Sequence, residues 1–154
     1  MPAQKRKRPR GVVDTSVPLA GIAGFKSLDI LKNPSAQLLR DWIERDTFLW
    51  LVTDEILFEY KRILARLGVR RQLIGRVVNL IREEAEFVVV STSPDISPDP
   101  GDDPFCGCAE TGRADFMVTL NPKGFPQSRL SAHVIVPGDK IPTTAPRRKQ
   151  ARRS

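Results

Sequence analysis

Short apolar runs alternate along this chain with longer stretches that have helical periodicity. The runs are short enough for buried strands, and they are Gly11–Asp14, Phe48–Val52, Phe87–Val90, Phe116–Leu120 and His133–Val136. Between them, apolar residues recur at three- and four-residue steps, which is typical of amphipathic helices. The predicted helices are Ser35–Asp46, Thr53–Leu67, Val69–Glu86 and Asp102–Gly112. This alternation predicts an α/β fold, a three-layer α/β/α domain around a mostly parallel central sheet.

Local signals indicate where these helices begin and which faces they bury. Ser35 and Thr53 are candidate N-caps, and Gly68 is a helix stop. The inward positions expected on the two longest helices are Ile56, Leu57, Tyr60, Ile63, Leu64 and Leu67, followed by Leu73, Val77, Leu80 and Ile81. Pro18–Pro34 is expected to be a long connection with a short helix in its middle, and Ser91–Gly101 a loop.

Composition limits the class of protein. The 154 residues fit one domain, and 40% hydrophobic residues are enough for an ordinary core. No apolar run approaches the ~20 residues needed to cross a bilayer, so we expect a cytoplasmic protein with no membrane partner. Cys106 and Cys108 are too close in sequence for a disulfide and are expected to be buried apolar residues. The single histidine, His133, is expected to be a strand residue.

The net charge of +7 is concentrated at the two ends. Residues 1–10 and 145–154 each carry five cations and no acid, which leaves residues 11–144 with a net charge of −3. We therefore predict a domain at 11–142 between disordered basic arms at 1–10 and 143–154. Such arms are attracted to polyanions, so nucleic-acid binding is expected from Lys5, Arg6, Lys7, Arg8, Arg147, Arg148 and Lys149. The alternative is that the arms only keep the protein soluble.

Four acidic residues stand where predicted elements begin or end, or beside an apolar stripe. Asp14 ends the first strand, Glu59 lies in the Thr53–Leu67 helix, Asp102 opens a helix and Asp115 leads into a strand. If the fold gathers them, their carboxylates repel, and a hard divalent cation relieves that repulsion.

Each of these acids except Asp14 has an ordinary structural explanation. Glu59 could pair with Lys61 or Arg62 at the surface. Asp102 and Asp103 could serve only as N-caps before a proline, and Asp115 could be a turn residue. Asp14 is the hardest to explain in this way, because a carboxylate at the end of a buried strand is costly to desolvate without a partner.

These residues and their neighbours resemble a PIN-domain ribonuclease, close to the toxin halves of bacterial toxin–antitoxin pairs. The matching segments are Val12–Ser16, Thr53–Leu64, Asp99–Phe105 and Gly112–Pro122. The resemblance implies a cluster of acids that binds Mg²⁺ or Mn²⁺ and hydrolyses RNA phosphodiester bonds. It also implies a cognate antitoxin protein and a homodimer as partners.

By position, Asp14, Glu59 and Asp102 match the three core acids of the family. Asn121 stands where a fourth acid often occurs, and Asp115 is the other candidate for that role. The resemblance implies that Asp14 is a direct or bridging metal ligand and that Glu59 and Asp102 are ligands or hold metal-bound waters. Outer support is expected from Asp115, Asn121, Thr15, Ser16 and Asp103.

Two other function classes fit the same sequence. The first is a non-catalytic nucleic-acid-binding protein on this fold, which Asn121 and the basic arms favour. The second is a structural partner protein, whose interface would be Pro18–Pro34 and the Leu- and Ile-rich helices.

Overall fold

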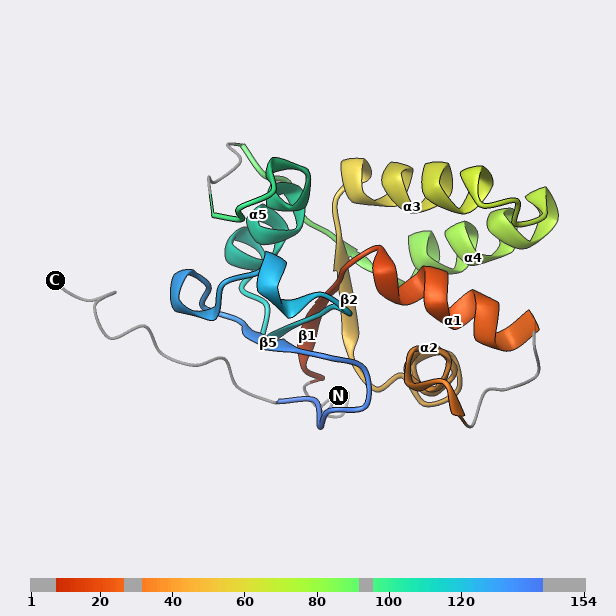
Figure 1. The fold of residues 1–154 in the computed structure, drawn as a ribbon, viewed down its shortest axis with the longest axis horizontal. Helices are drawn as coiled ribbons and strands as arrows, with labels where there is room; N and C mark the ends of the chain where they lie inside the picture. Colours follow the sequence, from red (N-terminus) through yellow and green to blue (C-terminus); the bar gives the residue numbers. More distant parts are fainter. Residues whose placement is uncertain (1–7, 27–31, 92–95, 143–154) are drawn as a thin grey trace, which may run out of the picture.

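A computed structural model describes residues 8–26, 32–91 and 96–142 (Figure 1). In these ranges five parallel strands form one sheet, in the order β3-β2-β1-β4-β5. The strands are β1 (Arg10–Val13), β2 (Leu49–Val52), β3 (Glu86–Phe87), β4 (Phe116–Val118) and β5 (His133–Ile135). The predicted α/β fold with a parallel sheet is confirmed.

The helices cover both faces of this sheet. Figure 1 shows α5 on one side of β1 and β2, and α1, α2 and α4 on the other. The bounds are α1 (Ser16–Lys26), α2 (Pro34–Arg45), α3 (Asp54–Arg66), α4 (Arg71–Glu84) and α5 (Asp103–Thr111). Three 3₁₀ turns complete the described elements: η2 (Pro100–Asp102), η3 (Pro122–Gly124) and η4 (Gln127–Arg129).

Several predicted element boundaries were wrong. Helix α1 begins immediately after β1 rather than in the middle of the Pro18–Pro34 connection, of which residues 27–31 lie outside the described ranges. Helix α2 is capped by Asn33, whose side chain accepts a hydrogen bond from the Ala36 N–H at 3.0 Å, and not by Ser35. Strand β3 has only two residues, because the chain pairs with β2 only at Glu86 and Phe87.

The predicted buried faces of two helices also need correction. On α4 the buried residues are Ile74, Val78 and Ile81, one position later than most of the expected stripe. On α3, Thr53 is the N-cap as predicted, but Leu67 at its C-terminal end is 66% exposed. Leu67 is the C-cap residue of α3, beyond Leu64, the last buried position of that helix, so its apolar character did not indicate burial.

Aromatic residues fill the core around the start of β1. Trp50, Phe48 and Phe116 are fully buried, and the rings of Phe48 and Phe116 meet at 5.3 Å. A side chain at Gly11 would place its Cβ 2.1 Å from the Phe116 ring, so this position of β1 requires glycine. Cys106 and Cys108 are buried and free, as predicted.

The described part of the N-terminal arm is held against the domain. The Arg8 guanidinium pairs with Asp46 at 2.5 Å, and Arg10 is the first residue of β1. Arg10 forms a bidentate pair with Glu86 at 2.8 and 3.0 Å. The other predicted arm residues, Lys5, Arg6, Lys7, Arg147, Arg148 and Lys149, lie outside the described residues. Among the described helices, none is long and apolar enough to span a membrane.

Candidate functional site

Asp14 stands at the carboxyl end of the central strand β1. Its backbone N–H donates to the Val118 carbonyl of β4 at 3.0 Å, which continues the ladder by one residue. The side chain is 8% exposed, and its Oδ2 accepts hydrogen bonds from Ser16 Oγ at 2.7 Å and Thr119 Oγ1 at 2.8 Å. Oδ1 accepts none from the described residues. Asp14 is thus a fixed carboxylate with one oxygen still available.

Helix α3 brings Glu59 to the same edge. The Thr15 hydroxyl donates to Glu59 Oε2 at 2.6 Å, which joins the residue after Asp14 to the second acid. The neighbouring Tyr60 is fully buried, donates its hydroxyl to the Val13 carbonyl and accepts from Trp50 Nε1 at 3.3 Å. Burial raises the pKa of Tyr60 well above its usual value, so the hydroxyl keeps its proton. Tyr60 therefore fixes α3 against the end of β1.

Asp102 lies close enough to the other two acids to respond to their charges. Burial, followed by repulsion from Asp14, Asp99, Glu59 and Asp103, raises the pKa of Asp102 from 3.8 to about 6. The three predicted core acids, Asp14, Glu59 and Asp102, are therefore gathered at one edge of the sheet.

Asn121 and Asp102 meet over Gly124. A Cβ built on Gly124 would lie 3.1 Å from Asp102 Oδ2 and 3.3 Å from Asn121 Nδ2. The glycine thus leaves open a space between these polar groups that a side chain would fill. Asn121 donates its backbone N–H to Thr119 Oγ1 at 3.0 Å. The hydroxyl of fully buried Thr119 therefore connects Asn121 to Asp14.

Thr119, Gly124 and Ser97 also belong to this site, although they were not predicted from the sequence. The available signal was the polar Thr119 directly after an apolar strand, where parallel strands present ligand-binding residues. Ser97 donates to the Gly124 carbonyl at 2.6 Å and is buried. Gly124 and Ser97 carry no comparable signal, because their role depends on loops that meet only in space.

Asp103 stabilises the loop that contains Ile96 and Ser97 rather than the three acids. Its Oδ1 accepts from the backbone N–H of Ile96 at 3.1 Å and of Ser97 at 2.7 Å. The Asp103 side chain is buried, and its hydrogen bonds hold this loop next to Asp102.

Asp115 does not join the cluster, and its prediction as a fourth site acid was wrong. In the register of β1 and β4, Gly11 pairs with Phe116 and Val13 with Val118. Asp115 therefore lies at the amino end of β4, about 13 Å along the strands from Asp14. Its Oδ2 accepts from the Arg10 backbone N–H at 2.8 Å, which anchors the start of β1.

The donor set fits a hard divalent cation. In the described ranges, no lysine or arginine pairs with Asp14, Glu59 or Asp102. Carboxylate and amide oxygens are the ligands that Mg²⁺ prefers, and unpaired carboxylates held together gain from a cation. Within the same ranges, no three acid, histidine or cysteine side chains form a preformed metal cluster. Binding an ion would therefore require the carboxylates to close in.

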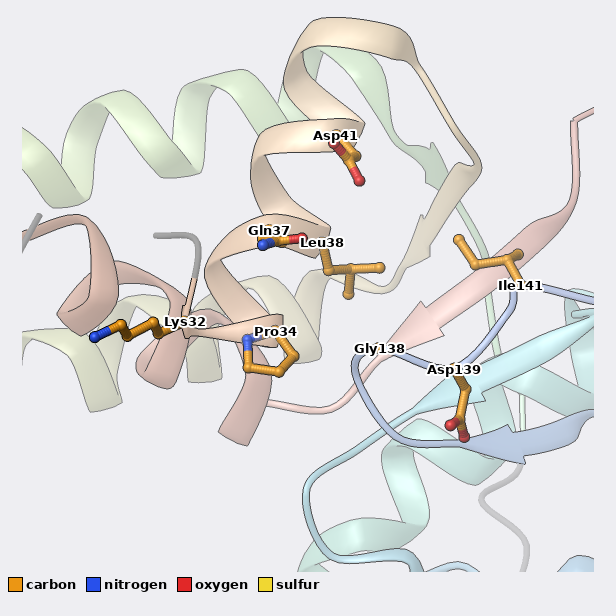
Figure 2. A pocket seen from close by; sticks show the side chains of 8 residues that line it. All are labelled: Lys32, Pro34, Gln37, Leu38, Asp41, Gly138, Asp139 and Ile141. Atoms are coloured by element: carbon orange, nitrogen blue, oxygen red, sulfur yellow. The ribbon is translucent and has the colours of Figure 1, made fainter. Parts of the chain in front are cut away.

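A separate hollow lies away from the acids. Figure 2 shows a cavity of about 310 Å³ between the start of α2 and the segment after β5, with Pro34, Leu38, Gly138 and Ile141 on its walls. None of the three acids lines it, so it is not part of the acidic site.

Comparison with known families agrees with this arrangement. The family model of the PIN domain matches residues 10–123, which extend from β1 through η3 and include all three clustered acids. No curated protein and no solved structure gave a significant match.

Proposed function

The chain belongs to the PIN-domain family, whose members are typically nucleases, and we propose that it is an endoribonuclease dependent on Mg²⁺ or Mn²⁺. The observation that carries this proposal is that Asp14, Glu59 and Asp102 lie at one edge of the sheet with no cationic partner among the described residues, and that burial together with repulsion from the neighbouring acids raises the pKa of Asp102 to about 6. Like charges held together in this way are costly without an ion.

In this proposal Asp14, Glu59 and Asp102 hold the ion, and the Asn121 amide lies beside them. A bound Mg²⁺ would acidify a water molecule and neutralise charge on the phosphate. Ser16 and Thr119 fix the Asp14 carboxylate, and Thr15 fixes Glu59, so both present oxygens in defined positions.

Asp102 is the acid that would gain most from a bound ion. Burial and repulsion raise its pKa to about 6 when no metal is bound, and a divalent cation would stabilise its carboxylate form. Asp102 directly precedes α5, beside the open space over Gly124, and in this proposal the substrate enters from that side.

The choice of metal follows from the donors. The site residues offer oxygen ligands, and the described cysteines and histidine are placed elsewhere, in α5 and β5. Sites of this type favour Mg²⁺ or Mn²⁺ over zinc or copper.

We propose further that this nuclease is the toxin of a two-gene pair, with a cognate antitoxin and a homodimeric state. The motif resemblance supports the role.

The test is RNA cleavage by the purified full chain, in Mg²⁺ and in EDTA, beside Asp14→Asn. The amide keeps the shape of the side chain and removes its charge, so we expect cleavage to require the metal and to be lost in this variant. Asp41→Asn on α2 makes the same change at an acid outside the cluster, and it should cleave normally. Equal cleavage by Asp14→Asn and the wild type would end the proposal.

The second candidate is a nucleic-acid-binding protein without catalysis. Asn121, an amide where relatives often carry an acid, favours it. This candidate predicts RNA binding that depends on salt, requires no metal and is unchanged in Asp14→Asn. Absence of cleavage under all conditions, with binding intact, would select it.

A further inference from the structure

The hairpin of α3 and α4 carries a concentration of positive charge that the acidic site does not use. Between residues 61 and 82 there are seven cations and no acid. We call these seven residues the basic hairpin: Lys61, Arg62, Arg66, Arg70, Arg71, Arg76 and Arg82. Since residues 11–144 have a net charge of −3, the remainder of that range sums to −10. The domain is therefore strongly polarised.

The charges of the basic hairpin are exposed and unneutralised. All seven residues are exposed, and in the described part of the chain none of them forms an ion pair. Arg62 and Arg66 are four residues apart on α3, a spacing at which like charges destabilise a helix. By contrast, the arginines of α2, Arg40 and Arg45, each pair with an acid four residues away. The cations of the basic hairpin therefore repel one another, and a bound polyanion would relieve this repulsion.

The basic hairpin continues directly from the acidic site. Glu59, Arg62 and Arg66 are spaced by three and four residues, so they share one face of α3. At the helical rise, Arg66 lies about 10 Å along the axis from Glu59. A chain of phosphates on this face would lead to the three clustered acids.

An exposed aromatic ring lies on the same hairpin. Phe58 is 64% exposed and lines a hollow of about 200 Å³ whose other lining residues are Asp54, Leu57, Lys61, Val78 and Arg82. An exposed aromatic ring close to cations is a combination that binds single-stranded nucleic acid, because bases stack on the ring while phosphates contact the cations. The hollow alone would not identify a ligand, but the surrounding charge selects an anionic one.

We propose that the basic hairpin is the docking surface for single-stranded RNA, with Phe58 as a stacking platform and Arg62 and Arg66 guiding the backbone toward the acidic site. This docking role rests on the proposed nuclease function and adds to it a place where the substrate is held away from the reacting phosphate.

The test measures binding without cleavage. The full chain is titrated in EDTA with a fluorescently labelled single-stranded RNA oligonucleotide over a series of salt concentrations. The variants are Arg62→Gln with Arg66→Gln, and Phe58→Leu. The matched control is Arg40→Gln with Arg45→Gln, which lowers the net charge equally on another helix. Because Arg62, Arg66 and Phe58 are exposed and Arg62 and Arg66 form no described ion pair, these variants should fold normally.

We expect the Arg62/Arg66 variant to bind more weakly than the control, with a salt slope smaller by about 1.4, as for two lost phosphate contacts to a single strand. Phe58→Leu should weaken binding about fivefold or more, at an unchanged salt slope. Equal affinity of the hairpin variant and the control overturns the proposal, and the positive surface would then face an acidic protein.

The two proposals fail separately. If Asp14→Asn loses cleavage but the hairpin variant binds RNA like the control, the nuclease function stands and the docking surface is wrong. If the wild type never cleaves RNA but the hairpin variant loses binding, the docking surface stands and the nuclease function is wrong.

Discussion

Replacing Asp102 by asparagine should make the metal-free protein more stable. The amide has the same shape but removes one negative charge from a group of carboxylates. Burial, and after it repulsion from the neighbouring acids, raises the pKa of Asp102 from 3.8 to about 6. Each pKa unit corresponds to about 1.36 kcal/mol, which gives about 3 kcal/mol for a fully buried group. Because the side chain is partly exposed, solvent screening reduces the expected gain to about 1–1.5 kcal/mol.

The gain should depend on pH in a defined direction. The folded state binds the Asp102 proton more tightly than the unfolded state, so stability from this group is present below about pH 4 and lost as pH rises through about 6. The amide of the Asp102→Asn variant does not titrate. The difference in unfolding free energy between Asp102→Asn and the wild type should therefore have its full value at about pH 8 and vanish at about pH 4.

A divalent ion should make the wild type more stable than Asp102→Asn, which reverses the order expected without metal. Ligand that binds only the folded state stabilises it, by about 2.7 kcal/mol at a hundred times Kd. In Mg²⁺ the unfolding free energy of the wild type should rise by this amount, and that of Asp102→Asn should rise less.

Urea unfolding followed by tryptophan fluorescence measures these differences, because Trp42 and Trp50 are 5% and 1% exposed and report on the core. Asp41→Asn serves as the control for a surface carboxylate. If Asp102→Asn is no more stable than the wild type at about pH 8 in EDTA, Asp102 does not belong to a repulsive cluster and the basis of the metal site is lost.

Further predictions concern the residues around the acids. Gly124→Ala would place a methyl group 3.1 Å from Asp102 Oδ2, so RNA cleavage should fall about tenfold or more with little change in thermal stability; normal cleavage would show that the space over Gly124 is not used. Thr119→Val removes the hydroxyl that donates to Asp14 and should cost about 1–3 kcal/mol in urea unfolding, whereas Thr119→Ser should restore the wild-type value. Tyr60→Phe leaves two buried polar groups without a partner and should cost a similar 1–3 kcal/mol; a neutral effect would mean that the hydroxyl does not fix α3.

Much of the fold could be predicted because apolar pattern and capping are local properties. The alternation of buried strands and amphipathic helices determined a parallel α/β sheet, and Thr53 marked the start of α3. The wrong predictions of burial and of strand length concern residues whose neighbours in space come from distant parts of the sequence. Leu67 is apolar but lies past the last buried position of α3, and β3 pairs with β2 only at Glu86 and Phe87.

The sequence by itself determined which residue types could form an oxygen-ligand site: Asp14 and Asp102 stand at the ends of predicted elements, Glu59 lies beside an apolar stripe, and the family resemblance matched all three. Only the tertiary structure decided which of the acids meet. Parallel register places Asp14, which follows β1, at one edge of the sheet and Asp115, which precedes β4, at the other. It also brought Thr119 and Gly124 into the site and left the cations of α3 and α4 unpaired at the surface. The physical reason is that repulsion, hydrogen bonding and ion pairing act over a few ångströms in space, whatever the separation along the chain.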